Sequence, residues 1–214
     1  MGRHKVIEVR HLTESTFVIR LERKGLVFQT GQFIILKYGN SIDQREYSVY
    51  SGENDDFLEI LVREVQGGKV SGKLKQVQTG MEIEVDGPFG FFKFNPEQFA
   101  SKKFLFIATG TGISPFHSFV KTFPNLDYQL IHGVRFGKEA YDHCDFEKKK
   151  VTLCTSADPM GNFYGRVTDY LFSQKPDTVT NCFLCGNSEM ISEVFDILTA
   201  KGIPTSNIYS EVYF

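Results

Sequence analysis

The pattern of apolar residues changes near Asn95-Pro96, and this change constrains the fold more than any other feature. Before it, short runs of β-branched and aromatic residues alternate with turns rich in Gly, Asn and Asp. After it, continuous apolar runs alternate with stretches of helical periodicity. A chain of 214 residues is long enough for two domains, each of about 100 residues. The sequence therefore predicts one domain over residues 1–98 and a second over residues 99–214.

Six short runs in the first half have the composition of β-strands, and Val70–Val77 is expected to form one short helix. Strands at this spacing favour an antiparallel barrel or sandwich, and we expect an antiparallel β-barrel. The predicted strands are Lys5–Arg10, Thr16–Glu22, Phe33–Tyr38, Glu46–Tyr50, Phe57–Glu64 and Glu82–Val85.

The second half alternates apolar runs with helical stretches, which implies a doubly wound parallel sheet. In the last helix, Ile191, Val194, Phe195 and Leu198 are expected to share one buried face. The predicted strands are Lys103–Ala108, Tyr128–His132, Val151–Thr155 and Asn181–Leu184, and the predicted helices are Ser114–Thr122, Thr168–Phe172 and Ser188–Lys201.

Composition and charge exclude several functional classes. The formal net charge of -2 gives no general attraction to nucleic acid or to anionic membranes. We find no run of about 20 apolar residues and no segment with the pattern of a signal peptide, so the expected compartment is the cytosol. The spacing of Cys182 and Cys185 matches half of a zinc site, but no second pair completes it, and the four-cysteine pattern of an iron–sulfur cluster is missing. We therefore expect no metal.

A glycine-rich segment, Gly110-Thr-Gly-Ile-Ser-Pro115, follows a predicted buried strand and opens a predicted helix. Glycines allow the backbone to approach a pyrophosphate, and the helix N-terminus offers free N–H groups and a favourable dipole. The segment is neither a Walker loop nor a complete G-x-G-x-x-G fingerprint. Taken alone, it fits an ordinary strand-to-helix turn as well as it fits a nucleotide site.

Two segments of the first half carry further anion-binding chemistry. Arg45 and Tyr47 lie two residues apart on a predicted strand, so their side chains share a face. One offers a guanidinium fork for phosphate, and the other offers an aromatic surface. Gly68 to Ser71 then opens the predicted short helix. Each segment has an ordinary structural alternative, a strand Arg with a surface partner or a capped helix, but their joint occurrence favours a phosphate-binding pair.

With these segments in this order, the chain resembles the ferredoxin–NADP(H) reductase family of two-domain flavoenzymes over nearly its whole length. The Gly87-Pro-Phe-Gly90 turn, Cys185-Gly186 with Met190, and Glu211 with Tyr213 add to the resemblance. It implies a first domain that binds FAD and a second domain that binds NAD(P)H.

The resemblance assigns FAD binding to three segments of the first domain. Arg45 would bond the pyrophosphate, Tyr47 would pack on the ribityl chain or the ring, and Ser48 would bond near flavin N5. The full set implied for FAD is Arg45, Tyr47, Ser48, Val62, Arg63, Gly68, Val70 and Ser71.

The nicotinamide nucleotide is assigned to the second domain. The catalytic residues implied by the resemblance are Ser48, Cys185, Glu211 and Tyr213, with Tyr213 stacked on the ring face that nicotinamide must occupy. The implied nucleotide-binding residues are Gly110, Thr111, Gly112, Pro115, Arg135, Ser156, Arg166, Cys185, Gly186, Met190 and Phe214.

The choice between NADH and NADPH depends on the residues after the third strand of the second domain. Many NADP-preferring members of the family carry an Arg there, whereas this chain has Ser156 and, two residues later, Asp158. Arg135 and Arg166 remain as possible partners for the 2′-phosphate. The sequence favours NADH, with NADPH tolerated.

The implied activity is hydride transfer between NAD(P)H and FAD, followed by single-electron transfer to a separate carrier such as ferredoxin or flavodoxin. One alternative is the reductase component of a multi-subunit oxygenase or another redox enzyme. A second alternative, a flavin-free binding module, is disfavoured by the intact motif residues Arg45, Tyr47, Ser48, Cys185 and Glu211.

Overall fold

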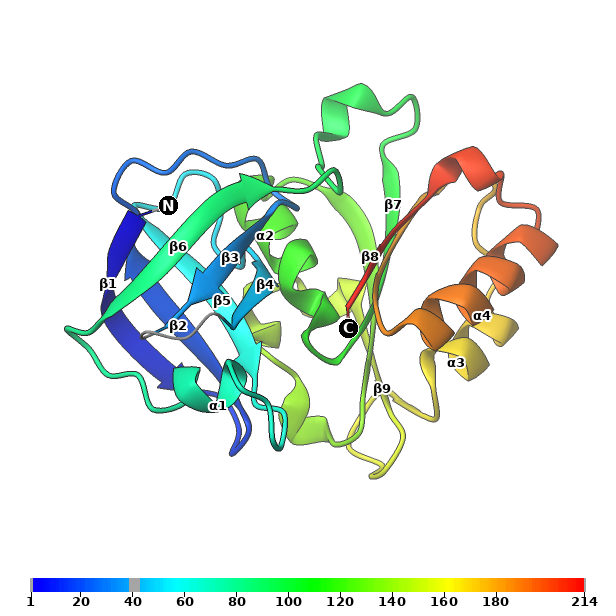
Figure 1. Ribbon diagram of the computed structural model, residues 1–214. Coiled ribbons are helices and arrows are strands. Elements are labelled where there is room, and N and C mark those ends of the chain that lie inside the picture. Colours follow the sequence, from blue (N-terminus) through cyan, green and yellow to red (C-terminus); the bar gives the residue numbers. More distant parts are fainter. Residues whose placement is uncertain (1, 39–42, 214) are drawn as a thin grey trace. The chain divides into compact units, whose positions relative to one another are not determined.

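A computed structural model describes residues 2–38 and 43–213 of the protein (Figure 1). The chain divides into two compact units. The first comprises Met1–Phe94 and Ser114–Thr122, and the second comprises Asn95–Ile113 and Phe123–Phe214. The predicted fold class, an antiparallel β-barrel followed by a parallel α/β sheet, is confirmed. The grouping of helix α2 (Ser114–Thr122) with the first unit is not evident from strand–helix alternation.

The first unit is built on six strands with the order β4-β3-β6-β1-β2-β5, all paired antiparallel. A bridge between Val49 and Ile60 joins the two ends of this order, and the Tyr50 amide donates to the Glu59 carbonyl at 2.8 Å. These contacts close the sheet into a barrel. The strands are β1 (Gly2–His11), β2 (Thr16–Glu22), β3 (Phe33–Lys37), β4 (Gln44–Ser48), β5 (Phe57–Arg63) and β6 (Glu82–Phe89).

The barrel interior is filled by the inward-facing aliphatic residues that strand alternation predicts, together with Leu74 and Val77. Helix α1 (Ser71–Leu74) is shorter than the predicted Val70–Val77. The Val77 amide bonds the Leu74 carbonyl three residues back, so the chain leaves the α-helical pattern there. Fully buried core residues include Val6, Phe17, Ile19, Leu21, Ile34, Leu36, Leu58, Ile60 and Val62.

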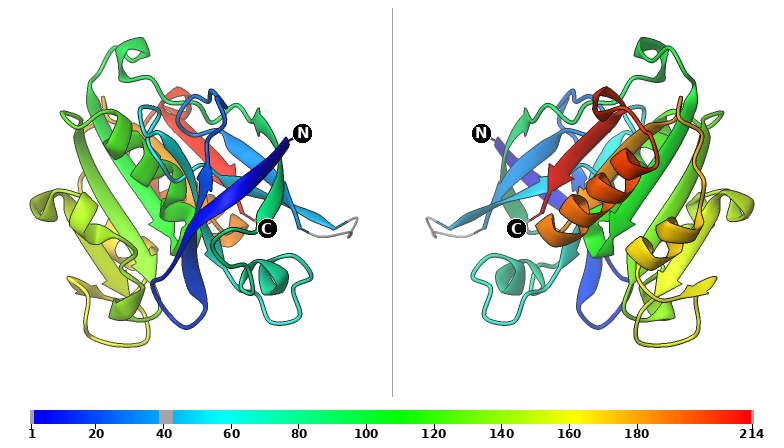
Figure 2. Two further views of the ribbon diagram at one scale, coloured as in Figure 1. Left: turned by 90° about the vertical axis from the view of Figure 1, so that its left-hand side faces the viewer. Right: turned by 90° about the vertical axis from the view of Figure 1, so that its right-hand side faces the viewer.

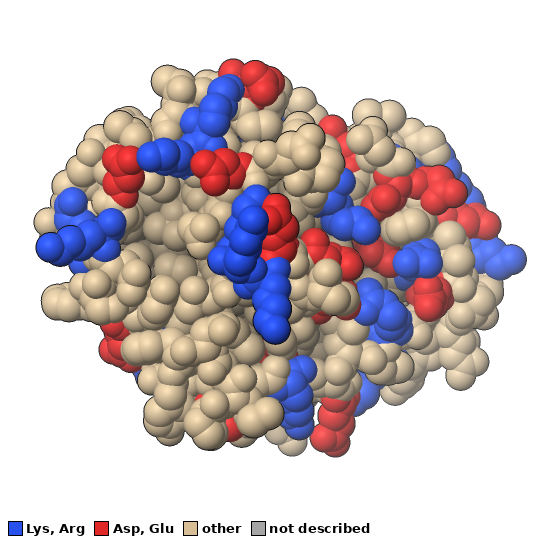
Figure 3. Space-filling view, turned by 180° about the vertical axis from the view of Figure 1, so that it is seen from behind, with Lys and Arg blue, Asp and Glu red and all other residues tan. Residues whose placement is uncertain are grey.

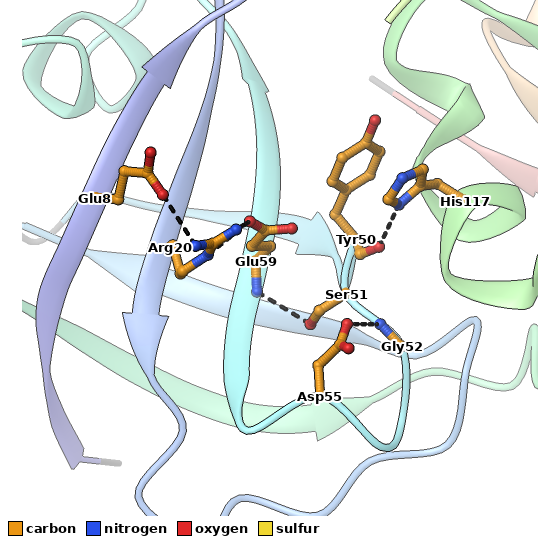
Figure 4. Close-up of polar contacts among 8 residues, drawn as sticks. All are labelled: Glu8, Arg20, Tyr50, Ser51, Gly52, Asp55, Glu59 and His117. Carbon is orange, nitrogen blue, oxygen red and sulfur yellow. Dashed lines mark hydrogen bonds and ion pairs between the residues drawn. The ribbon is translucent and has the colours of Figure 1, made fainter. Parts of the chain in front are cut away.

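Helix α2 is attached to the barrel by buried polar contacts as well as by packing (Figure 4). The His117 and Tyr50 rings stack with centroids 3.8 Å apart, and His117 Nδ1 lies 2.7 Å from the Tyr50 carbonyl oxygen. The Ser118 hydroxyl donates to the Ser51 carbonyl at 2.7 Å and accepts from the Thr30 hydroxyl at 2.7 Å. Since buried polar groups are costly when unpaired, these bonds fix the helix in one place on the barrel.

The second unit is built on a parallel sheet with the order β10-β9-β8-β7-β11-β12. Helices α3 (Val167–Ser173) and α4 (Ser188–Ala200) pack together on one face of it, as the right-hand view of Figure 2 shows. Short 3₁₀ turns occupy the crossover between β8 and β9. The strands are β7 (Lys103–Thr109), β8 (Asp127–Val134), β9 (Val151–Thr155), β10 (Phe163–Tyr164), β11 (Asn181–Gly186) and β12 (Ile208–Val212).

The two faces of this sheet carry different side chains. Aliphatic residues face α3 and α4, and Ile191, Val194 and Leu198 of α4 are buried there as predicted. Phe195 differs, because 38% of it is exposed. Alternation along β11 puts Cys182 in the core with the helices and Cys185 on the opposite face, so the pair does not form a metal knuckle. A cluster of aromatic rings comprises Phe99, Phe104, Phe106, Tyr128, Phe183 and Tyr209.

The described part of the chain, residues 2–38 and 43–213, contains no helix long and apolar enough to cross a bilayer. The same residues contain no group of three or more His, Cys, Asp and Glu that is placed to hold a metal ion. On the face shown in Figure 3, basic and acidic side chains lie interspersed. This mixture is consistent with the small net charge of the sequence.

One ion-pair network on the barrel offers a test of its stability. Arg20 donates from Nε to Glu59 at 2.9 Å and lies 3.0 Å from Glu8 (Figure 4). The Glu59 side chain is 8% exposed and that of Glu8 is 48% exposed. We expect Glu59→Ala to lower the free energy of unfolding by about 1–3 kcal/mol, since it removes the buried acceptor of Arg20, which keeps its contact with Glu8. Glu8→Ala, the matched control, should cost less than about 1 kcal/mol. Chemical denaturation of both variants checks this, and equal losses would contradict it.

Candidate cofactor and nucleotide sites

Arg45 and Tyr47 lie on β4, where Arg45 pairs with Leu36 and Tyr47 pairs with Ile34 of β3. Because the two residues are separated by one position, their side chains leave the same face of the strand. Arg45 is exposed and Tyr47 is half-buried. Burial raises the pKa of the Tyr47 phenol to about 12, against a smaller lowering by the charge of Arg45. A cation and a neutral phenol donor are therefore presented side by side on one edge of the barrel.

The other residues predicted to bind FAD are placed unequally. Ser48 ends β4 and is 4% exposed, whereas Arg63 ends β5 and is exposed. Val62 and Val70 both pack inside the barrel core, Val62 with no exposed surface. Their side chains therefore support the barrel, and only their main-chain groups are left to meet a ligand.

The turn before α1 is held closed by its own serine. The Ser71 hydroxyl accepts from the Val65 amide at 3.1 Å, and the Gly68 amide donates to the Val65 carbonyl at 2.8 Å. A Cβ atom at position 68 would lie 2.7 Å from Ser71 Oγ and 2.9 Å from the Val65 oxygen. Glycine is therefore required at position 68 for the turn to close.

In the second unit, the glycine-rich segment forms a 3₁₀ turn, Gly110–Ile113, at the carboxyl end of β7. Gly110 has a φ of 53°, a conformation that favours glycine. A Cβ atom at position 112 would lie 2.3 Å from the Cys185 carbonyl oxygen, so the turn packs directly on the end of β11. Pro115 is the second residue of α2, within the first turn as predicted.

The structure brings the predicted catalytic residues of the second unit together. Cys185 pairs with Glu211 across β11 and β12, and the Tyr213 amide donates to the Gly186 carbonyl at 2.8 Å. Cys185 is fully buried, whereas Glu211 and Tyr213 are half-buried. Burial first, and the charge of Glu211 second, hold the pKa of the Cys185 thiol well above its usual value, while a hydrogen bond with Tyr213 acts in the opposite direction. The thiol is therefore neutral and is not an activated nucleophile.

Of three further predicted residues, Gly186 and Met190 flank this cluster. Gly186 has a φ of 148°, and a Cβ atom there would lie 3.0 Å from Met190 Cε. The amide of Met190 donates to the side chain of Asn187, which caps α4. Phe214 lies outside the described residues.

Arg135, Ser156 and Arg166 follow β8, β9 and β10, three neighbouring strands at the same edge of the sheet. All three residues are exposed. The Ala157 amide donates to the Arg135 carbonyl at 2.8 Å, which joins the first two segments. Asp158 accepts at 3.0–3.1 Å from the amides of Gly137 and Met160, so its carboxylate holds the local turn.

A histidine pair beside the glycine turn, the buried His132 and the half-buried His143, was not predicted from the sequence. His132 Nε2 lies 2.9 Å from the Gly110 carbonyl oxygen, and its Nδ1 lies 2.8 Å from His143 Nε2. One signal was available, since His132 is a polar residue at the carboxyl end of an apolar strand. Thr109 was also missed: its hydroxyl is buried with no hydrogen-bond partner among the residues that the structure describes.

Comparison with known proteins assigns the first unit. Residues 4–94 match the model of the oxidoreductase FAD-binding domain. This range covers the whole barrel except the first two residues of β1. The first unit of the protein therefore contains an FAD-binding domain of the ferredoxin–NADP reductase-like family. The predicted FAD cofactor is thereby confirmed for this family of domains.

The relatives of this FAD-binding protein include reductase components of oxygenases and ferredoxin–NADP reductases. The electron transfer component of toluate 1,2-dioxygenase from Pseudomonas putida is 26% identical over 97% of this chain and 66% of its own length. A ferredoxin–NADP reductase from Pseudomonas aeruginosa is 27% identical over 94% of this chain and 90% of its own length. The chain spans about two thirds of the length of the oxygenase relatives: 66% of the toluate dioxygenase component and 64% of a glycine betaine monooxygenase reductase subunit from Chromohalobacter salexigens.

Solved structures agree with this fold. A ferredoxin–NADP reductase from Neisseria gonorrhoeae with bound FAD and NADP is 26% identical, with a TM-score of 0.86 over 100% of this chain and 98% of that one. A cytochrome P450 reductase from Amycolatopsis has a TM-score of 0.88 over 99% of this chain and 69% of that one, at 24% identity.

The exposed groups of this FAD-binding domain have the chemistry that the cofactor needs. FAD presents a pyrophosphate, which a guanidinium binds through charge-assisted bonds, and a flat ring, which an aromatic residue covers. Arg45 supplies the first and Tyr47 the second. The closed turn at Gly68 brings the main chain of positions 65 and 68 and the Ser71 hydroxyl close together, a compact polar turn of the kind that can receive a phosphate. The residues present therefore fit FAD.

The buried histidines make the stability of the second unit depend on pH. Burial lowers the pKa of His132 to about 3, and that of His143 to about 4. In the unfolded chain both values return to about 6.5, so the unfolded state binds more protons as the pH falls through this range. The contribution of the two histidines to the free energy of unfolding is therefore fully present above the pKa of the unfolded chain, and it is lost as the pH falls toward the pKa values of the folded protein.

We expect the free energy of unfolding to fall by about 2 kcal/mol per histidine between pH 7 and pH 5. Denaturant titrations with FAD in constant excess measure it. A variant with both His132→Phe and His143→Phe should show a flatter profile over the same interval. A wild-type protein of equal stability at the two pH values would contradict the assignment.

Proposed function

We propose that the protein is an FAD-dependent oxidoreductase that takes electrons from NAD(P)H and passes them singly to a separate carrier. The observation that carries this proposal is the oxidoreductase FAD-binding domain over residues 4–94, followed in the same chain by a parallel sheet with a glycine turn. The Neisseria gonorrhoeae reductase, which contains bound FAD and NADP, supports the proposal that this chain binds both ligands.

Bound FAD would supply the conversion between two-electron and one-electron transfer. The first unit would hold it by charge and by stacking. Arg45 would bind the pyrophosphate, Tyr47 would cover the ribityl chain or the ring, and Ser48 would orient the reactive edge. Gly68 and Ser71 would shape the turn that receives the phosphates.

The second unit would bind the nicotinamide nucleotide at the carboxyl edge of its sheet, where open α/β sheets bind ligands. Gly110, Thr111 and Gly112 form the 3₁₀ turn at the end of β7, and its main chain would meet the diphosphate. The exposed Arg135 and Arg166 follow strands that end at the same edge, and they remain the candidate partners of a 2′-phosphate if one binds.

Cys185, Glu211 and Tyr213 would orient the nicotinamide for hydride transfer. The thiol of Cys185 would lie beside the nicotinamide as a neutral group and not as a nucleophile, because its raised pKa keeps it protonated. The half-buried Glu211 would offer a hydrogen-bond acceptor, and Tyr213 would occupy the ring face until the nucleotide displaces it. These are positioning roles, since the flavin carries the chemistry.

We propose a separate ferredoxin or flavodoxin as the electron carrier. The similarity to ferredoxin–NADP reductases extends over 90% and 98% of the length of two of them, which supports this choice. The alternative is a reductase component of an oxygenase, and the Pseudomonas putida relative supports it. Anaerobic reduction of purified ferredoxin, flavodoxin and an oxygenase iron–sulfur component by the NAD(P)H-reduced protein separates the two.

The purified protein should be yellow, should release FAD on denaturation, and should lose its flavin absorbance when NAD(P)H is added anaerobically. Arg45→Ala should weaken FAD binding roughly 10- to 150-fold, because a charge-assisted bond is worth about 1.5–3 kcal/mol. Lys37→Ala removes one cation from the neighbouring strand, where Lys37 lies 3.6 Å from Glu84, and serves as the control. Flavin extraction and fluorescence titration measure both variants. Release of FMN, or unchanged FAD affinity in Arg45→Ala, would refute the assignment.

We expect kcat/KM to be higher with NADH than with NADPH. Ser156 supplies no charge for a 2′-phosphate, and the Asp158 carboxylate lies in the same turn. A missing charge-assisted contact is worth roughly 10- to 150-fold. Arg135→Ala and Arg166→Ala should then change the ratio of the two kcat/KM values less than about threefold, below the worth of one such contact. A kcat/KM more than about tenfold higher with NADPH, which corresponds to about 1.4 kcal/mol, would overturn the expectation. If one of the two variants then lost that preference for NADPH, the substituted residue would be the phosphate-binding arginine.

A further inference from the structure

The buried His132 and the half-buried His143 form a chain of hydrogen bonds that ends on the glycine turn. His132 has no exposed surface and lies at the carboxyl end of β8. Its Nε2 is 2.9 Å from the Gly110 carbonyl oxygen, and its Nδ1 is 2.8 Å from His143 Nε2. Both imidazole nitrogens of His132 are therefore engaged.

The direction of these bonds follows from their acceptor. A carbonyl oxygen only accepts, so Nε2 of His132 carries the proton and Nδ1 is left as an acceptor. His143 must then donate from its own Nε2. Burial lowers the pKa of both rings, which keeps them neutral and allows each to donate with one nitrogen and accept with the other.

The crossover between β8 and β9 holds His143 in place. His143 begins a 3₁₀ turn and packs against the Phe146 ring at a centroid distance of 6.1 Å. The buried Tyr141 packs on His132 at 6.0 Å. Further along the same crossover, the buried Glu139 accepts from the Arg135 amide at 3.0 Å. This segment is therefore a fixed frame for the histidine pair.

The hydrogen bond from His132 to the Gly110 carbonyl fixes the orientation of the whole Gly110–Thr111 peptide group. The Gly110 carbonyl and the Thr111 amide belong to one planar trans peptide, in which C=O and N–H point in opposite directions. Gly110 has a φ of 53°, and a glycine has few steric barriers against rotation of the adjoining peptide. A donor that holds the carbonyl on the His132 side therefore turns the Thr111 amide to the opposite side.

We propose that His132 is a positioning residue for nucleotide binding, which holds the Gly110–Thr111 peptide so that the Thr111 amide meets the diphosphate of NAD(P)H. His143 sets the tautomer of His132 that this task needs. The proposal rests on the proposed function of the glycine turn. It assigns a purpose to two polar side chains inside a unit whose other interior residues are mostly apolar.

The test uses the FAD-loaded protein and two probes, ADP-ribose, which has the diphosphate, and 5′-AMP, which has a single phosphate. His132→Phe removes the donor and keeps a ring, His132→Gln restores an N–H donor, and His143→Leu removes the partner. His4→Phe is the matched control, because His4 is also buried and its Nδ1 lies 2.7 Å from the Glu22 carbonyl oxygen, in the first unit. Calorimetric titration gives the dissociation constants.

His132→Phe should weaken ADP-ribose binding about tenfold and 5′-AMP binding less than twofold, since one positioned amide is lost. His132→Gln should recover most of the loss, and His143→Leu should show a smaller loss of the same kind. His4→Phe should bind both probes normally. The FAD content should be the same in all four variants.

Three results overturn the proposal. The first is wild-type affinity for ADP-ribose in a folded His132→Phe protein. The second is an equal loss for both probes, which marks His132 as a core residue only. The third is an Nδ1–H tautomer of His132 in long-range ¹H–¹⁵N spectra of the wild type, a measurement that needs no variant to fold. A wild-type protein that binds neither ADP-ribose nor NAD(P)⁺ refutes the proposed function itself.

Discussion

The carboxyl ends of β7 and β11 approach so closely that only a glycine fits between them. A Cβ atom at Gly112 would lie 2.3 Å from the Cys185 carbonyl oxygen, so any side chain at this position would clash with the backbone. This contact places the glycine turn against Cys185-Gly186, and the bond from the Tyr213 amide to Gly186 brings the end of β12 to the same point. Segments more than 70 residues apart in the sequence therefore meet because two backbones are allowed to touch. The candidate nucleotide site depends on that approach.

The barrel of the first unit holds the polar side chains of β4 on a scaffold whose interior is apolar. Closure through Val49 and Ile60 fixes the chain directly after β4, while β3 pairs with β4 along Arg45 and Tyr47. The network of Arg20 and Glu59 and the bonds from α2 lie around the residues that follow β4. The exposed cation of Arg45 is thus supported by a rigid strand, which lowers the entropy lost when a phosphate binds.

Most of the fold could be predicted because strand alternation and helical periodicity are local signals. The residue pattern gave helix α2 with its exact bounds, and chain order gave the motif residues. It did not indicate that α2 joins the first unit, since this depends on the stacking of His117 on Tyr50. It did not reveal β12, whose residues are nearly all half-buried, or the fact that Val62 and Val70 face the barrel core. These features depend on pairing between distant segments, which a single sequence does not encode locally.

Polar residues inside the second unit show where packing alone was insufficient. A leucine at position 132 would fill the same space at a lower cost of desolvation, because a buried imidazole must satisfy two nitrogens. The chain instead places a second histidine at position 143 and builds a crossover with three 3₁₀ turns in which it is held. The buried imidazole offsets its desolvation by bonding the Gly110 carbonyl. We infer that this bond fixes the direction of the peptide to which the carbonyl belongs. The same strand edge carries Thr109, whose buried hydroxyl stands beside the glycine turn. The buried polar groups of Thr109 and His132 thus lie at the carboxyl ends of β7 and β8, on the edge of the sheet where the glycine turn lies.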